Sequence, residues 1–240
     1  PGGIRAIIGL GNPGPRYEST RHNAGYLVVE ALRRGGERPL TVFQPGETSG
    51  PRWRSARSYQ FATVRLDQVA IHLARPLTFM NRSGTAAREL LEAAGIQPAE
   101  LLVVADDVSL PMGRLRFRTG GSSGGHRGLE SLVTELGTSD FPRLRVGVGG
   151  PPVGQDLAEY VLEPLSGASL AALEDLAATA AEAAVFACLE GVSQAMNRYN
   201  GRSASSAPEQ AEETGGAALA NPPLSCENAG QDSDPMGEPF

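Results

Sequence analysis

The sequence predicts an α/β fold in which helices flank both faces of one mixed β-sheet. Short apolar runs typical of strands alternate along the chain with longer stretches whose apolar residues recur at helical spacing. This alternation is typical of helices packed on both sides of a sheet. Two of the runs, 61–66 and 69–74, are separated by only Asp67 and Gln68, which favours an antiparallel hairpin and therefore a mixed sheet.

The individual elements follow from the same patterns, taken in chain order. The runs at 4–9 and 101–105 are both followed by helical stretches, and they place Asn12 and Asp106 at their carboxyl ends. Open α/β sheets gather their functional sites at this edge. We predict strands at 4–9, 61–66, 69–74, 101–105, 114–118 and 144–148, and helices at 20–34, 81–94, 127–136, 155–162 and 170–198.

The end of the chain differs in composition from the rest. Residues 202–240 are rich in Ser, Ala, Gly, Pro and Glu, so they cannot bury enough apolar area to offset the entropy of ordering. We therefore predict a folded domain at 1–201 and a disordered acidic tail at 202–240. Residues 203–240 hold seven acids and no base, which leaves 21 arginines against 20 acids before them. A nearly neutral body of this kind predicts at most a local basic patch.

The composition also argues against a membrane or secreted protein. No apolar run approaches the roughly 20 residues that a membrane-spanning helix needs, and the N-terminus lacks a basic-then-apolar signal segment. The two cysteines, Cys188 and Cys226, have neither disulfide nor metal-ligand spacing. We expect a cytoplasmic protein without a metal or cofactor.

A glycine string near the N-terminus has two interpretations. Gly9, Gly11 and Gly14 match the literal dinucleotide-binding pattern, which would make the protein a nucleotide-dependent oxidoreductase that binds NAD. Pro13 has no N–H to offer a pyrophosphate, however, and Pro15 delays entry into the following helix. We therefore set this interpretation aside and expect a tight turn beside His22, one of only three histidines.

Six ordered motif blocks extend from residue 9 to residue 200. They are Gly9-Leu-Gly-Asn-Pro-Gly14 with Thr20-Arg-His-Asn-Ala-Gly25; Phe79-Met-Asn-Arg-Ser-Gly84; Val103-Val-Ala-Asp-Asp107 with Leu110-Pro111; Gly124-Gly-His-Arg-Gly-Leu129; Phe141-Pro-Arg-Leu-Arg-Val-Gly-Val-Gly149; and Ala195-Met-Asn-Arg-Tyr-Asn200. In residues and order the set resembles the bacterial-type peptidyl-tRNA hydrolase family. The resemblance implies one α/β domain that acts as a cofactor-free monomer and cuts the ester between a peptide and the 3′-terminal ribose of tRNA.

The resemblance also implies how the site divides its chemistry. Ester hydrolysis needs a base for water, a group that orients the base, and donors to the carbonyl oxygen. His22 matches the base, Asp106 matches its hydrogen-bonded partner, and Asn12 matches an amide that helps to distinguish blocked from free aminoacyl-tRNA. We expect the adjacent Asp107 to cap the turn at the strand end.

Substrate contacts are implied for eight further residues. Arg127 stands where the family often has Asn, and an arginine cannot accept a hydrogen bond, so any contact there goes to a carbonyl oxygen or a phosphate. For Met80, a place in the core competes with ligand contact. Arg118 and Arg143 are expected to bind phosphates near the 5′ end of the acceptor stem. The full set is Tyr17, Phe79, Met80, Asn81, Arg118, His126, Arg127 and Arg143.

A second class of function stays open beside the enzyme. Homologues of this fold serve as RNA-binding splicing factors in chloroplasts, where binding without turnover is the function. The presence of His22, Asp106, Asn12 and Asn81 favours the enzyme. Release of an N-blocked amino acid from charged tRNA discriminates between the two functions.

Overall fold

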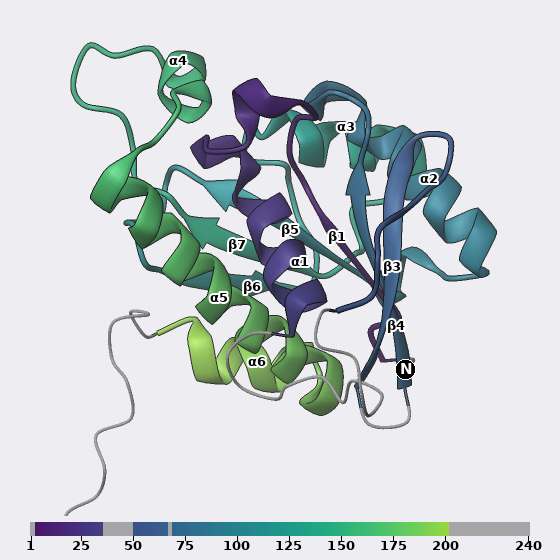
Figure 1. The fold of residues 1–240 in the computed structure, drawn as a ribbon. Helices are drawn as coiled ribbons and strands as arrows, with labels where there is room; N and C mark the ends of the chain where they lie inside the picture. The colour runs from purple at the N-terminus through teal and green to yellow at the C-terminus, as the bar shows by residue number, and fades with distance from the viewer. Residues whose placement is uncertain (1–2, 36–49, 67–68, 202–240) are drawn as a thin grey trace, which may run out of the picture. The chain divides into compact units, whose positions relative to one another are not determined.

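One mixed β-sheet forms the centre of the domain. The structure, a computed structural model, describes residues 3–35, 50–66 and 69–201, so the predicted tail at 202–240 lies outside the described residues. Seven strands pair in the order β2-β3-β4-β1-β5-β7-β6 (Figure 1). They are β1 (Ala6–Gly9), β2 (Arg54–Ser55), β3 (Tyr59–Leu66), β4 (Val69–Pro76), β5 (Leu101–Asp107), β6 (Leu115–Arg118) and β7 (Arg143–Gly147).

Strand directions confirm the predicted mixed sheet. The central strands β4, β1, β5 and β7 run parallel to one another, so their carboxyl ends meet at one edge. The pair β3 and β4 forms the expected antiparallel hairpin, with Leu66 opposite Val69. At the other end of the sheet, β6 pairs antiparallel with β7. The edge where the parallel strands end is therefore the expected location of the site.

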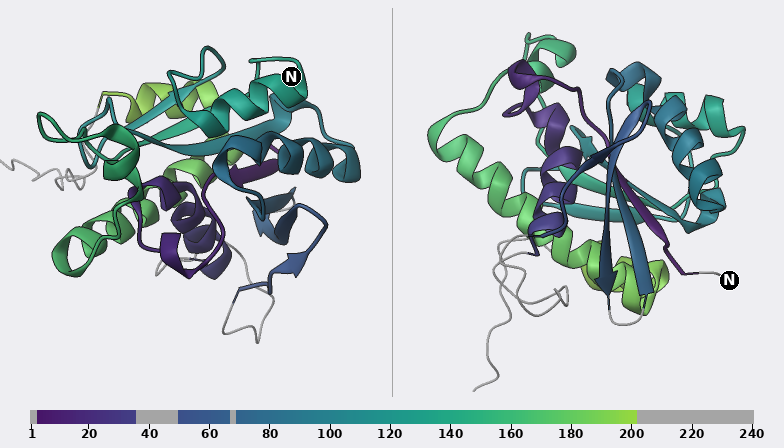
Figure 2. Two further views of the ribbon diagram at one scale, coloured as in Figure 1. Left: turned by 90° about the horizontal axis from the view of Figure 1, so that it is seen from above. Right: turned by 45° about the vertical axis from the view of Figure 1, so that its right-hand side comes forward.

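Helices cover both faces of the sheet, as predicted. One apolar core joins the sheet to α1 (Ala24–Arg34), α5 (Gly167–Glu190) and α6 (Val192–Tyr199). A second core joins the opposite face to α2 (Ser83–Ala94) and α3 (Arg127–Leu136). The right-hand view of Figure 2 shows the sheet between these two layers. A short helix, α4 (Leu157–Leu162), precedes α5, and no described helix is long and apolar enough to cross a membrane.

Two predicted helices were wrong in their extent, and one strand was missed. The expected helix at 20–34 begins with a separate 3₁₀ turn, Arg21–Asn23, so His22 lies just before α1 instead of in its first turn. The expected helix at 170–198 is interrupted at Gly191, whose φ of 90° and ψ of 155° cannot continue an α-helix. Strand β2 was not predicted, because two exposed residues are too few to show an alternating pattern.

Gly25 explains how the start of α1 comes so close to the sheet. A Cβ atom on Gly25 would lie 2.4 Å from the backbone nitrogen of Leu10 and 2.5 Å from the carbonyl oxygen of Val104. No other residue fits this approach without moving the backbone of both strands. The glycine thereby allows the turn that carries His22 to pack directly against β1 and β5.

Candidate active site

The predicted site residues gather at the edge where the parallel strands end. Asn12 follows β1, Phe79 and Asn81 follow β4, and Asp106 lies near the end of β5. The pairing of β1 with both β4 and β5 in parallel places these three segments side by side. The sequence prediction that Asn12 and Asp106 lie at strand carboxyl ends is confirmed.

His22 and Asp106 form the expected hydrogen bond. The Nδ1 atom of His22 lies 2.9 Å from Oδ1 and 3.1 Å from Oδ2 of Asp106. A second imidazole, that of His126, approaches the same carboxylate, with its Nε2 atom 3.0 Å from Oδ1. The two rings lie 5.1 Å apart. The carboxylate of Asp106 therefore serves two histidines that are 104 positions apart in the chain.

The hydrogen bonds of His126 fix the proton positions of the whole group. The Nδ1 atom of His126 accepts hydrogen bonds from the backbone N–H groups of Gly128 and Leu129, at 3.1 and 3.2 Å, and so caps the start of α3. A nitrogen that accepts carries no proton, so the ring is neutral and its Nε2–H donates to Asp106. As an ionised carboxylate can only accept, Nδ1 of His22 is also a donor. The remaining nitrogen of His22, Nε2, then has a free lone pair in its neutral form, as a general base requires.

Burial and the two imidazoles act on Asp106 in opposite directions. Its side chain is buried, and this desolvation works to raise the pKa of the carboxyl group. The electrostatic attraction and hydrogen bonds of the His126 and His22 N–H groups outweigh desolvation and hold the pKa well below its ordinary value. Asp106 is therefore ionised throughout the physiological range and can stabilise an imidazolium at His22.

The same three side chains could be considered as metal ligands. Their nearest donor atoms all lie within 4.8 Å of one another, and the three residues come from segments too distant for sequence spacing to reveal. The inferred proton positions argue against such a site, since Nδ1 of His22 and Nε2 of His126 both carry protons that point at Asp106. A metal ion would have to displace both protons. The donor set therefore fits a hydrogen-bonded triad better than a metal centre.

Asn12 is held by backbone contacts on both sides. Its backbone N–H donates to Oδ1 of Asn23 at 2.8 Å, and Nδ2 of Asn23 donates to its carbonyl at 3.0 Å. The side-chain oxygen of Asn12 accepts from the N–H of Met80 at 2.8 Å. This bond orients the amide, so that the donor Nδ2 has no partner among the described residues. Asn12 thus offers one fixed N–H donor at the strand edge.

Four of the predicted substrate-binding residues are partly or fully exposed. The rings of Tyr17 and Phe79 meet edge to face, with centroids 6.4 Å apart, although Phe79 remains 57% exposed. Asn81 and Arg127 line a surface cleft of about 440 Å³ together with Glu130, Ser131, Thr134 and Glu135. The structure therefore brings together Tyr17 with Phe79, and Asn81 with Arg127.

Met80 belongs to the core, which corrects the prediction of substrate contact. Its side chain is 4% exposed and packs within the apolar cluster beneath α2 and α3. A Cβ atom on Gly128 would lie 2.5 Å from the sulfur of Met80, so the two helices close over it. What Met80 contributes to the site is its backbone N–H, which orients Asn12.

The prediction that Arg143 binds a phosphate was also wrong. It is 2% exposed, and its guanidinium donates to the carbonyl oxygens of Ser122 and Ser139 at 2.6 and 3.3 Å. These bonds tie the segments before and after α3 to β7, and the side chain is too buried to meet a phosphate. Arg118, directly opposite Arg143 on the edge strand β6, is exposed and remains available.

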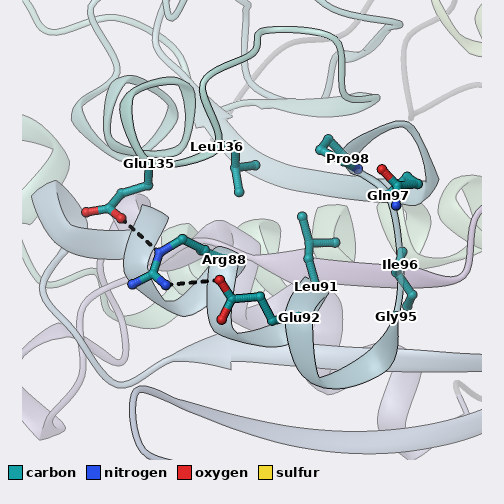
Figure 3. Close-up of a pocket in the computed structure, with 9 residues that line it drawn as sticks. All are labelled: Arg88, Leu91, Glu92, Gly95, Ile96, Gln97, Pro98, Glu135 and Leu136. Carbon is teal, nitrogen blue, oxygen red and sulfur yellow. Dashed lines mark hydrogen bonds and ion pairs between the residues drawn. The ribbon is translucent and has the colours of Figure 1, made fainter.

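A second cleft lies between the C-terminal ends of α2 and α3. It measures about 410 Å³, and Figure 3 shows Arg88 bridging the carboxylates of Glu135 and Glu92 at its rim. None of the predicted site residues lines it. Because its charged groups already pair with one another, this cleft has no evident part in the chemistry at His22.

The sequence prediction missed three parts of the site. It assigned His126 only to substrate, whereas both nitrogens of this ring are used within the protein. It gave no part to Asn23, which clamps Asn12, or to Arg145, which lies 3.0 Å from Asp107. The position of His126 directly before the predicted helix at 127–136 was the one available signal, since a side chain at that position can cap the helix. Asp107 does cap its turn as expected, accepting from the backbone N–H of Ser109 at 2.9 Å.

Comparisons with known proteins agree with this geometry. The family model described as peptidyl-tRNA hydrolase matches residues 6–208. The peptidyl-tRNA hydrolase of Moorella thermoacetica is 45% identical over 199 residues, which cover 82% of this chain and 98% of that protein. That of Synechococcus sp. strain JA-3-3Ab is 44% identical over 198 residues, covering 82% and 83%. A crystal structure of peptidyl-tRNA hydrolase from Acinetobacter baumannii superposes with a TM-score of 0.70 at 28% identity, covering 84% of this chain and 97% of that one.

Proposed function

This chain belongs to the peptidyl-tRNA hydrolase family and hydrolyses peptidyl-tRNA, and from that premise we propose that His22 is its general base. The lone pair on Nε2 of His22 takes a proton from water, and the resulting hydroxide attacks the ester carbonyl carbon. The bond between this carbon and the 3′ oxygen of the ribose breaks, and the imidazolium returns the proton to that oxygen. The products are a peptide with a free carboxyl group and free tRNA.

Asp106 and His126 support this proton transfer. The imidazolium formed at His22 is stabilised by the ionised carboxylate 2.9 Å from its Nδ1. His126 stays neutral because its Nδ1 caps α3, so it adds a hydrogen bond to Asp106 without competing for the proton. We assign His126 to orienting the carboxylate, in place of the substrate contact expected from the sequence.

Asn12 supplies the donor to the ester. Its Nδ2 has no partner among the described residues, its side-chain oxygen is held by the N–H of Met80, and its backbone is held by Asn23. A preorganised donor of this kind stabilises the negative charge that develops on the carbonyl oxygen, an effect that typically contributes about 3–4 kcal/mol. Free aminoacyl-tRNA carries a charged amine instead of an amide, so the same region would discriminate between the two.

The surface residues are assigned to holding the two parts of the substrate. Asn81 and Arg127 share a cleft and can hydrogen-bond to peptide carbonyl groups, and Tyr17 with Phe79 offers an exposed apolar contact. Arg118 is exposed on the edge strand and suits a tRNA phosphate. We further assign the protein to the cytoplasm, where peptidyl-tRNA is formed, and to a monomeric state.

The observation that carries the proposal is the single ionised carboxylate that fixes His22 with its Nε2 free. The test is release of the N-blocked amino acid from N-acetyl-aminoacyl-tRNA, with free aminoacyl-tRNA as the matched control. We expect rapid release from the first substrate and little from the second. Binding of tRNA without release would instead identify a non-catalytic RNA-binding protein of the same fold.

A further inference from the structure

Arg21 joins α4 to the turn that carries His22. Its Nη1 donates to the carbonyl oxygen of Tyr160 at 3.0 Å and lies 3.3 Å from Oε2 of Glu163. The guanidinium carbon sits 4.0 Å from the centroid of the Tyr160 ring, well within cation–π distance. The side chain of Arg21 is only 14% exposed, so this contact lies inside the protein and is not open to the substrate.

Backbone contacts reinforce the same junction. The N–H of Leu165 donates to the carbonyl of Ser19 at 2.9 Å, and Thr20 forms an isolated antiparallel bridge with Pro164. Residues 19–21 are thus attached to the segment around α4 through both backbone and side chain. Figure 1 shows α4 beside the purple turns that precede α1.

The other half of the turn is attached to the sheet. His22 bonds to Asp106 on β5, and Asn23 bonds to Asn12 after β1. The segment around α4 is attached to the same sheet, because the hydroxyl of Tyr160 donates to the carbonyl of Val148 at 3.1 Å, just beyond β7. The 3₁₀ turn is therefore held on one side by the segment around α4 and on the other by β1 and β5. These two supports are joined through the pairing of β5 with β7.

From this closed arrangement we propose that Arg21 is a positioning residue for His22, acting through its stack on Tyr160. A three-residue 3₁₀ turn has little rigidity of its own, so the orientation of the His22 ring depends on the contacts of the turn with both the α4 segment and the sheet. When the contacts of Arg21 with α4 are lost, the His22 ring leaves its hydrogen bond to Asp106 part of the time and samples other orientations. A misplacement of about 1 Å at a reacting group costs up to about a hundredfold in rate.

The planar guanidinium, and not its charge alone, performs this role. The ion pair with Glu163 is weak, since the Glu163 side chain is 56% exposed and solvent screens it. The Nε atom of Arg21 is buried without a partner among the described residues, so the guanidinium is shielded from solvent where it stacks on the Tyr160 ring. Lysine would keep the charge but lose both the flat stacking surface and the fork of donors.

The test compares Arg21→Gln and Arg21→Lys with the matched control Glu163→Gln, in the full chain and with N-acetyl-aminoacyl-tRNA. We expect both Arg21 variants to lower kcat by about ten- to a hundredfold with KM within about twofold, and Glu163→Gln to resemble the parent protein. The downfield proton NMR signal of the His22 Nδ1–H, bonded to Asp106, should broaden or vanish in the Arg21 variants. If Arg21→Gln melts below the assay temperature, Arg21→Lys carries the test because it retains the ion pair.

Two results would overturn the proposal. An unchanged kcat together with an unchanged NMR signal would reduce Arg21 to a structural contact, and a raised KM at constant kcat would make it a substrate-binding residue. Because the proposal rests on His22 as the base, the NMR signal is needed to distinguish a failure of the role of Arg21 from a failure of the role of His22. A lost signal with unchanged kcat would refute the assignment of His22, while the dependence of the ring on Arg21 would stand.

Discussion

Replacing Asp106 with Asn tests the inferred proton positions at the site. Asparagine keeps the size of the side chain. Its oxygen can still accept from Nε2 of His126, which lies 3.0 Å from Oδ1 of Asp106 in the parent protein. The amide nitrogen then occupies the position of Oδ2, 3.1 Å from Nδ1 of His22, and its N–H groups compete with the oxygen at the Oδ1 position, 2.9 Å away, for that nitrogen. This competition shifts His22 towards the tautomer with its proton on Nε2, which cannot take a proton from water.

The size of the effect follows from two losses. Removing a hydrogen bond between a charged pair costs about 1.5–3 kcal/mol, and the unfavourable tautomer adds roughly 1–2 kcal/mol. Together they predict a fall in kcat of about a hundredfold to ten-thousandfold, with KM little changed.

Single-turnover release of N-acetyl-amino acid from tRNA measures the chemical step of this variant directly. The matched control is Asp107→Asn, which removes a neighbouring carboxylate that caps the turn and lies 3.0 Å from Arg145. We expect the control to lose far less activity than Asp106→Asn. If Asp107→Asn were the more damaging change, the assignment of the orienting carboxylate would be refuted.

Three further predictions concern RNA binding, acid stability and the tail. Arg118→Ala should raise KM for whole charged tRNA at nearly constant kcat and flatten the salt dependence by roughly one phosphate contact; an equal loss on a short 3′ fragment would contradict a phosphate contact. Glu30 is desolvated, yet hydrogen bonds from Arg33, Trp53 and Arg34 lower its pKa to about 2, so its stabilisation is complete above pH 4.5 and is lost as the pH falls towards 2. Glu30→Gln should therefore cost up to about 3 kcal/mol in denaturant unfolding at pH 7 and progressively less below pH 4.5, and a constant difference would argue against this pairing. A chain that ends at Arg202 should keep its melting temperature and activity, and a clear fall in either would show that the tail packs on the domain.

Periodicity was sufficient to predict the sheet and most helices, because each element has one apolar face. The hairpin of β3 and β4 and the two helical layers are confirmed for that reason. Elements without such a face escaped prediction: β2 has two exposed residues, and the break at Gly191 lies inside an alanine-rich stretch whose pattern continues across it.

The site was predictable only where its residues follow strands. Asn12 and Asp106 could be placed because parallel strands end at one edge. The second imidazole on Asp106 could not, since the position of His126 depends on how α3 packs against the sheet. Burial likewise separates Arg118 from Arg143 on paired strands, and the sequence around each arginine does not show which side chain the fold covers.

The central claim is that His22 is the base of peptidyl-tRNA hydrolysis. The most direct test is single-turnover cleavage of N-acetyl-aminoacyl-tRNA by His22→Ala, with tRNA affinity measured on the same preparation. Removing the imidazole takes away the base but little contact area, so we predict a fall of at least about a thousandfold in the chemical step and a Kd within about threefold of the parent protein. Cleavage at close to the parent rate would contradict the account.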